Sequence, residues 1–186
     1  MGKFFESILE KHKNFIEKQK IFFVATAPLS KHGHVNVSPK GTDTFRVLSS
    51  NKVAYLDLIS SGNETSAHCL ENGRITIMMC SFEGPANILR LYGKGYTVLP
   101  DDEQWDSLSN HFDVPLAVRQ IMVVDVYKVQ TSCGYGVPFF SYEGERDEHK
   151  KWSDHKGSEG LKEYMLENNL TSLDGLTTVL GVKNEK

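Results

Sequence analysis

Residues 56–68 read LDLISSGNETSAH, an apolar strand that runs through a polar turn into a helix. A junction of this kind leaves the first backbone N–H groups of the helix free, and the positive end of the helix dipole lies at the turn. Asn63, Thr65 and Ser66 add polar side chains beside those groups. The junction is therefore suited to bind a phosphate.

A second interpretation of the same turn needs no ligand. Ser61 and Glu64 have the S-x-x-E spacing of a capping box, in which the two side chains satisfy the helix's own N–H groups. Because most helices need a cap, the local chemistry alone favours capping. The rest of the chain has to decide between a phosphate site and a cap.

Six apolar segments are predicted to form strands, and they are residues 21–27, 34–38, 53–58, 74–82, 88–99 and 121–129. Most gaps between them are too short for the helical crossovers of a parallel sheet. Helices are expected at residues 4–19, 63–72, 100–111 and 159–168. The pattern predicts a mainly β protein, a mostly antiparallel β-barrel with flanking helices.

We predict a single domain over residues 1–186, because no repeat or linker divides the chain. Residues 1–20 would contribute an N-terminal helix that packs its aromatic edge on the barrel. Beyond Cys133 the sequence becomes irregular, and the charged stretch 146–156 is expected to be a solvated loop. The chain would end in a polar tail.

Composition excludes several classes of protein. The net charge of −3 gives no general attraction to nucleic acid or to an anionic membrane. The longest apolar run, residues 21–27, is far shorter than the ~20 residues of a membrane span. Cys69, Cys80 and Cys133 are odd in number and widely spaced, which indicates reduced thiols and a cytoplasmic location.

Motifs of metal and nucleotide chemistry are missing from the sequence. Asp147, His149, Asp154 and His155 cluster downstream of Cys133, but their spacing matches no zinc pattern, so no metal site is predicted. The chain has no G-x-S-x-G nucleophile elbow, no Walker A loop and no G-x-G-x-x-G fingerprint after a strand.

Single residues elsewhere allow two interpretations each. Lys40, before Gly41 at a strand end, can neutralise a phosphate, although an isolated lysine is usually a solvated turn residue. Gly93 and Gly95 lie inside a predicted strand, where glycine marks a bend or the close approach of a backbone or a ligand. His68 is expected to pack or cap rather than to act as a base.

Taken together, segments along nearly the whole chain resemble the pyridoxamine 5′-phosphate oxidase-like flavin-binding family. These segments are residues 22–27, 34–41, 61–68, 72–78, 82–85, 89–95, 133–138 and 152–161. The resemblance implies a split β-barrel homodimer that holds FMN at the subunit interface. With the resemblance included, the phosphate interpretation of residues 61–68 is favoured over capping.

The resemblance also implies a set of cofactor-binding residues, namely Ser38, Lys40, Asn63, Thr65, Ser66, Cys133 and Trp152. Ser38 and Lys40 would lie along the flavin, with Lys40 near the phosphate. Asn63, Thr65 and Ser66 would hold the phosphate at the helix start. Cys133 and Trp152 belong to an extension over residues 133–186 that would close the pocket from the other protomer. Gly93 and Gly95 would leave room for a flat ring.

One departure from the family leaves the substrate unidentified. True pyridoxamine phosphate oxidases end in a Trp, an Arg-Leu-x-Pro region and an Arg-x-His element, whereas residues 176–183 here read LTTVLGVK. The expected function is an FMN-dependent oxidoreductase acting on a small molecule. The alternatives are a flavin-binding module without turnover, or the same barrel holding haem or a deazaflavin. No catalytic residue is predicted, because the flavin carries the redox chemistry.

Overall fold

The computed structural model describes residues 2–185. The elements in chain order are β1 (Lys3–Phe5), α1 (Glu10–Ile16), β2 (Phe22–Thr26), β3 (Asn36–Lys40), β4 (Phe45–Ser49), β5 (Lys52–Leu58), α2 (Glu64–Asn72), β6 (Arg74–Cys80), β7 (Ile88–Val98), α3 (Trp105–Ser109), β8 (Val118–Ser132), α4 (Glu148–Asn168) and α5 (Val179–Asn184). No helix among the described residues is long and apolar enough to cross a membrane.

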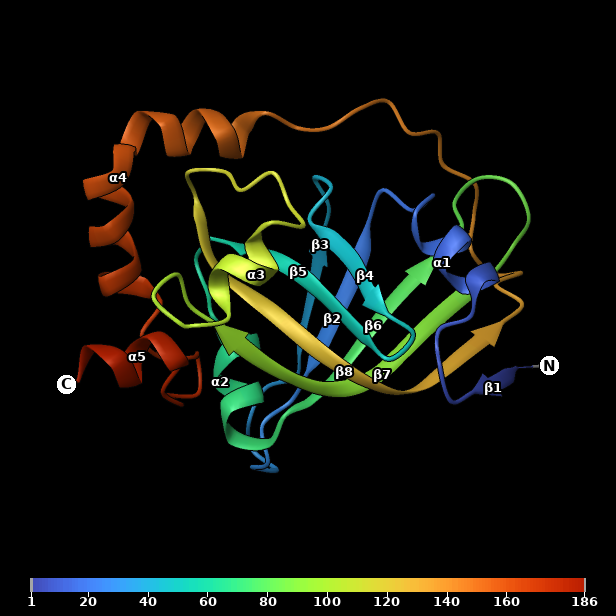
Figure 1. The fold of residues 1–186 in the computed structure, drawn as a ribbon, viewed down its shortest axis with the longest axis horizontal. Coiled ribbons are helices and arrows are strands. Elements are labelled where there is room, and N and C mark those ends of the chain that lie inside the picture. Colours follow the sequence, from blue (N-terminus) through green and yellow to red (C-terminus); the bar gives the residue numbers. More distant parts are fainter. Residues whose placement is uncertain (1, 186) are drawn as a thin grey trace.

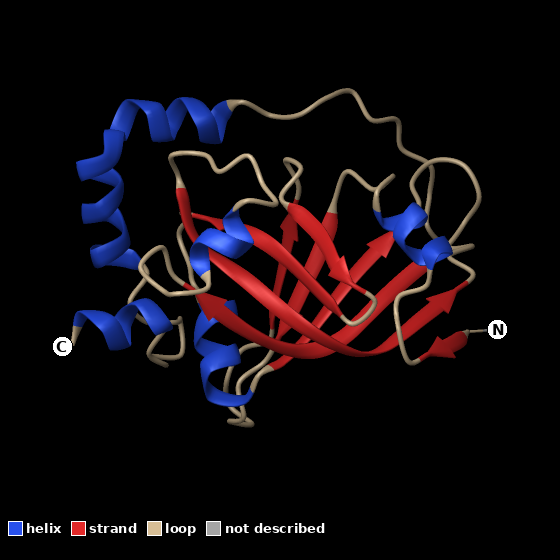
Figure 2. Ribbon diagram, viewed as in Figure 1, coloured by secondary structure: helices blue, strands red, loops and turns tan. Residues whose placement is uncertain are grey.

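All eight strands belong to one sheet, in which every pairing is antiparallel. The strand order is β3-β2-β6-β7-β8-β5-β4, with β1 paired to the end of β8. The sheet twists and curls at the centre of the molecule, and the helices lie around it (Figures 1 and 2). The predicted mainly β fold with flanking helices is confirmed.

The two ends of the strand path approach each other. Lys40 at the end of β3 contacts Asp57 on β5, the strand beside β4 at the other end of the path. The interior that these strands enclose is filled by fully buried side chains such as Val24 and Ile77. This closure forms the core and also brings polar side chains of β3 and β5 together.

The glycines inside β7 make room for neighbouring protein rather than for a ligand. A Cβ atom at Gly95 would lie 2.8 Å from the Cys69 sulfur of α2, and one at Gly93 would meet Val124 and the Asp125 carbonyl of β8. Gly93 also lies at a register shift between β7 and β8. The expected bend and close backbone approach are confirmed, and the expected space for a flat ring at these glycines is wrong.

The N-terminal helix is shorter than predicted. Residues 3–5 form β1, which pairs with β8 from Lys3↔Thr131 to Phe5↔Val129. Strand β5 covers β8 only up to Asp125, so that edge of β8 is free to accept another strand beyond this point. Phe5 packs on the core cluster while Phe4 is exposed, the alternation typical of a strand.

The C-terminal part contains more helix than predicted. The charged stretch expected to be a loop forms the first half of α4, where Lys151–Asp147 and Lys150–Asp154 are i,i+4 ion pairs of the kind that supports a helix. Gly157, with a φ of 63°, separates the two halves. The expected polar tail contains α5, whose first turn is capped by the Thr178 hydroxyl.

Figure 1 shows how this part wraps the barrel. From the end of β8 the chain crosses above the sheet as an extended segment, continues as α4 and ends with α5 near α2. A small cluster of Ile59, Ala117 and Leu161, with Trp152 and Tyr164 packed against it, fixes α4 to the end of β5. The C-terminal part therefore reaches the turn between β5 and α2.

Candidate functional site

Strand β3 presents a row of polar side chains toward the start of α2. The Asn36 side-chain amide donates to the Thr65 hydroxyl at 3.1 Å, and the Ser38 hydroxyl donates to the Asn36 side-chain oxygen at 2.9 Å. β3 pairs with β2 alone, so these alternate residues lie along an edge strand. The structure thus brings two predicted residues, Ser38 and Thr65, to either side of Asn36.

Lys40 ends this row and has a partner that the sequence did not predict. Its ammonium lies 2.6 Å from one carboxylate oxygen of Asp57, and Arg119 lies 2.7 Å from the other. Burial by itself would raise the pKa of the Asp57 carboxyl, but Arg119 and Lys40 hold it well below its usual range. Two cations share one carboxylate, so this cluster carries one net positive charge.

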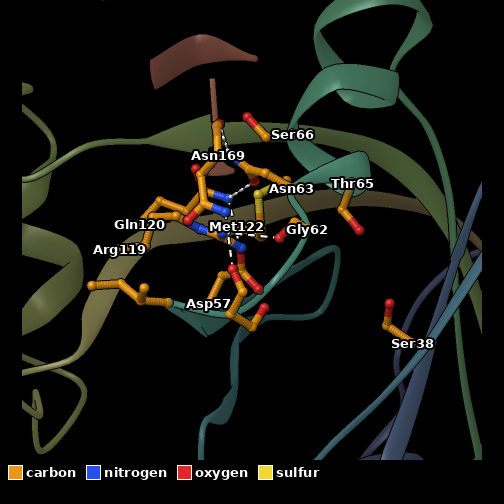
Figure 3. Close-up of polar contacts among 12 residues, drawn as sticks. Ser38, Asp57, Gly62, Asn63, Thr65, Ser66, Arg119, Gln120, Met122 and Asn169 are labelled. Atoms are coloured by element: carbon orange, nitrogen blue, oxygen red, sulfur yellow. Dashed lines mark hydrogen bonds and ion pairs between the residues drawn. The ribbon is translucent and has the colours of Figure 1, made fainter. Parts of the chain in front are cut away.

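The same cluster fixes the turn between β5 and α2 (Figure 3). Arg119 donates to the Gly62 carbonyl at 2.9 Å, and the Gln120 amide donates to both Asp57 and the Asn63 side-chain oxygen. Asn63 is buried and donates in turn to the backbone carbonyl of Asn169 at 3.0 Å. The turn is therefore positioned by buried polar groups from β8 and from the C-terminal part.

The capping interpretation of residues 61–64 is wrong. Helix α2 starts at Glu64 with Asn63 as its N-cap residue, and no side chain makes a capping hydrogen bond. Ser61 is exposed, while the Glu64 carboxylate accepts a hydrogen bond from the backbone N–H of Leu173. The N–H groups of the first helical turn are left without a side-chain cap, as a helix that receives an anion requires.

Ser66 is less accessible than predicted. Its hydroxyl oxygen accepts hydrogen bonds from the Thr97 hydroxyl at 3.0 Å and from the Val179 backbone N–H at 3.3 Å. The residue is fully buried. Thr65 is also buried, and its hydroxyl accepts from Asn36 and lies beside the hydroxyl of the buried Tyr55.

Buried polar atoms without a protein partner surround the turn. Within residues 2–185 they include Arg119 Nε, Gln120 Oε1, Asn169 Oδ1 and Tyr55 Oη. Buried polar groups are nearly always satisfied, so such a group of exceptions indicates a water or a polar ligand. Gln120 and Asn169 already donate through their amide nitrogens to Asp57, Asn63 and Ser60, so their unpartnered atoms are oxygens, which accept hydrogen bonds and suit a water. The donors that fit a phosphate here are the uncapped N–H groups at the start of α2 and the Lys40 ammonium.

His68 belongs to the packing of this region. Its Nδ1 lies 3.0 Å from the Thr26 hydroxyl, and its ring is fully buried. Burial lowers the pKa of the ring. As the sequence predicted, it is a packing histidine.

Cys133 and Trp152 are not brought together. Cys133 is exposed and follows Ser132, which pairs with Ile88 at one end of β8, whereas Trp152 packs near Ile59 at the end of β5. Within one chain only Trp152 lies toward the turn. Whether both residues close a pocket of the other protomer stays a prediction.

An open groove of about 1360 Å³ begins beside Lys40. Its walls are the Lys40–Thr42 connection, α1 with the residues that follow it, the β6–β7 loop and the extended segment before α4. Phe82, Phe140 and Tyr142 supply aromatic surface. The groove offers the space for a flat ring that the glycines of β7 do not.

Several site residues escaped the sequence reasoning. They are Asn36, Asp57, Arg119, Gln120 and Asn169. Asp57 carried a usable signal, because a carboxylate inside a buried strand needs a cationic partner. Among the described residues no group of three or more His, Cys, Asp or Glu could hold a metal ion.

The fold and this site define a split-barrel protein with an uncapped helix start, and comparisons with known proteins give its family. Residues 8–133 match the family model described as pyridoxamine 5′-phosphate oxidase. The pyridoxamine 5′-phosphate oxidase family protein ustO of Aspergillus flavus is 36% identical over 200 residues, covering 98% of this chain and 80% of that protein. The chain belongs to the pyridoxamine 5′-phosphate oxidase family.

Solved structures agree on the fold. A HupZ variant from Group A Streptococcus matches with a TM-score of 0.53 and 18% identity, over 67% of this chain and 99% of that chain. An FMN-binding protein from Syntrophomonas wolfei matches with a TM-score of 0.50 and 16% identity, over 66% of this chain and 84% of that chain. Each alignment leaves about a third of this chain unmatched.

Proposed function

We propose that this protein binds FMN and acts as an FMN-dependent oxidoreductase on a small molecule. The observation that carries the proposal is the uncapped start of α2 beside a cluster of one carboxylate and two cations. Membership of the pyridoxamine 5′-phosphate oxidase family and the fold shared with an FMN-binding protein support it. When bound, the flavin would supply the electron transfer.

The residues of the chain would bind and orient the cofactor. The N–H groups of the first turn of α2 and the Thr65 hydroxyl would donate to the phosphate, and Asn63 would hold the turn. Ser38 and Lys40 would lie along the flavin, with the net positive charge at Asp57 favouring the phosphate dianion. The groove beside Lys40 would receive the ring and exclude water from one side.

Extraction of the cofactor from purified protein tests the proposal. The protein should be yellow and should release about one FMN per chain on denaturation, identified by mass spectrometry. Recovery of haem or a deazaflavin, or no binding of added FMN, would contradict it. A flavin-loaded protein that turns over no candidate substrate would instead be a binding module without catalysis.

We also propose that the protein is a homodimer that needs its partner to retain flavin. The segment after β8 exposes large aromatic side chains, with Tyr135 85%, Phe139 81% and Phe140 60% exposed. Side chains of this type are enriched in interfaces between protein chains. Sedimentation velocity of the loaded protein should give a dimer, and a flavin-loaded monomer would refute the proposal.

Pyridoxamine 5′-phosphate is not expected to be a substrate. Its phosphate would need a second cationic site, for which arginine is best suited. Most arginines of the chain already have protein partners, namely Arg46, Arg74, Arg90 and Arg119. An assay for pyridoxal 5′-phosphate formation with oxygen should detect negligible turnover. A rate on the order of 1 per second would contradict this expectation.

A further inference from the structure

The segment from residue 169 to residue 184, called here the C-terminal strap, lies directly against the turn before α2. The Asn169 side-chain amide donates to the Ser60 carbonyl at 2.9 Å, and its backbone carbonyl accepts from the Asn63 side chain at 3.0 Å. Asn169 is fully buried. One residue of the strap therefore restrains both ends of the turn, and Figure 3 shows its contact with Asn63.

Further contacts continue from the turn into the helix. The Leu173 backbone N–H donates to the Glu64 carboxylate at 3.2 Å, and the Val179 backbone N–H donates to the Ser66 hydroxyl at 3.3 Å. The strap thus contacts the residues whose backbone N–H groups would face a phosphate.

The strap is itself ordered around Asn169. The Thr178 hydroxyl donates to the Asn169 carbonyl at 2.9 Å, and the Asn169 backbone N–H donates to the Met165 carbonyl at 2.9 Å. At the far end Lys183 lies 2.6 Å from Asp101 and 2.8 Å from Asp102. The Asn169 carbonyl accepts from both the Asn63 side chain and the Thr178 hydroxyl, and these two donors fix its direction.

The strap lies outside the part of the chain that the family model matches. The family model ends at residue 133, and the solved structures of similar fold cover about two thirds of this chain. The barrel strands that carry Asp57, Arg119 and Gln120 lie inside the matched region, whereas Asn169 lies outside it.

We propose that Asn169 is a positioning residue for the phosphate site and that the strap and the cofactor phosphate stabilise each other. The inference rests on the proposed function. The direction of the N–H groups at the start of α2 depends on the backbone of residues 60–63, and Asn169 holds this turn through the Ser60 carbonyl and the Asn63 side chain. Without this restraint the turn would have to become ordered when the phosphate binds, and the lost conformational entropy would weaken binding.

A pair of neighbouring asparagines gives a matched test. Asn169→Ala removes the contact to Ser60, whereas Asn168→Ala removes only an exposed bond to the Tyr164 carbonyl within α4. Affinities for FMN and for riboflavin, which lacks the phosphate, are measured by titration calorimetry. Asn169→Ala should weaken FMN roughly tenfold, the worth of one neutral hydrogen bond, with a much smaller effect on riboflavin. Asn168→Ala should change neither.

Hydrogen exchange on the wild-type protein gives a second readout that needs no variant. FMN should slow exchange in peptides that cover residues 169–184 more than riboflavin does. Equal weakening of both ligands by Asn169→Ala overturns the inference while leaving the proposed function intact. If that variant does not fold, absence of FMN-specific protection overturns the inference. Wild-type protein that binds no FMN would instead remove the proposed function.

Discussion

The barrel strands and the C-terminal part from residue 133 onward are held by different forces. The barrel surrounds a continuous cluster of buried aliphatic and aromatic side chains contributed mainly by β2, β5, β6, β7 and β8. The C-terminal part packs through one small cluster around Leu161 and an aromatic contact between Phe82 and Phe140, and it is otherwise attached by hydrogen bonds and ion pairs. The candidate site lies where the two meet, so its geometry depends on polar contacts more than on the core.

The largest expected effect tests the buried polar junction on the barrel side. Asp57→Asn leaves Arg119 buried without a charged partner, and breaking a buried ion pair costs about 3–5 kcal/mol of unfolding free energy. Asp43→Asn, which removes the exposed pair with Arg46, should cost less than about 1 kcal/mol. Urea denaturation measures both, and similar values for the two variants would contradict the assignment.

The same cluster predicts a dependence on pH. The pKa of Asp57 is held low in the folded protein, so its stabilising contribution is complete above its unfolded pKa of about 4. This contribution is lost as the pH falls toward the folded value. The difference in unfolding free energy between wild type and Asp57→Asn should therefore shrink as the pH is lowered below about 4.

A smaller effect concerns ligand affinity at the junction. Thr65→Ala removes a hydroxyl that would donate to the phosphate, and a hydrogen bond to a charged group is worth about 1.5–3 kcal/mol. FMN should bind roughly ten- to a hundredfold more weakly, with little change for riboflavin. Titration calorimetry of Thr65→Ala and of wild type makes the comparison. If both ligands weaken equally, Thr65 only shapes the turn.

The smallest effect comes from His68, which anchors α2 to β2 through Thr26. Burial lowers its pKa, so below the unfolded value of about 6.5 the unfolded chain binds a proton that the folded protein does not. Stability should therefore fall on account of this group as the pH is lowered through about 6.5. His68→Gln should reduce this loss, whereas a substitution of the exposed His32 should leave it unchanged.

The contrast between the two regions also explains what the sequence could predict. Strands of the barrel appear as apolar runs because their residues are buried, as in 121–124. β4 was missed because most of its residues are only partly buried and give no clear pattern. β1 depends on a free edge of β8, which no local pattern records.

The candidate site was predictable only where its residues are contiguous. The turn and helix start were recognised from residues 61–66, but the partners of the turn are distant in sequence. Arg119 is 62 residues from Asp57, and Asn169 is 106 residues from Asn63. Tertiary structure alone brings these side chains together, so their hydrogen bonds had no local signal.

Comparison of FMN and riboflavin binding to the wild-type protein tests the central claim most directly. The two ligands share the flavin ring, so any difference in affinity reports the phosphate. If the start of α2 and the Lys40–Asp57–Arg119 cluster receive that phosphate, FMN should bind at least about a hundredfold more tightly in titration calorimetry. Equal affinities, or binding of neither flavin, would contradict the account.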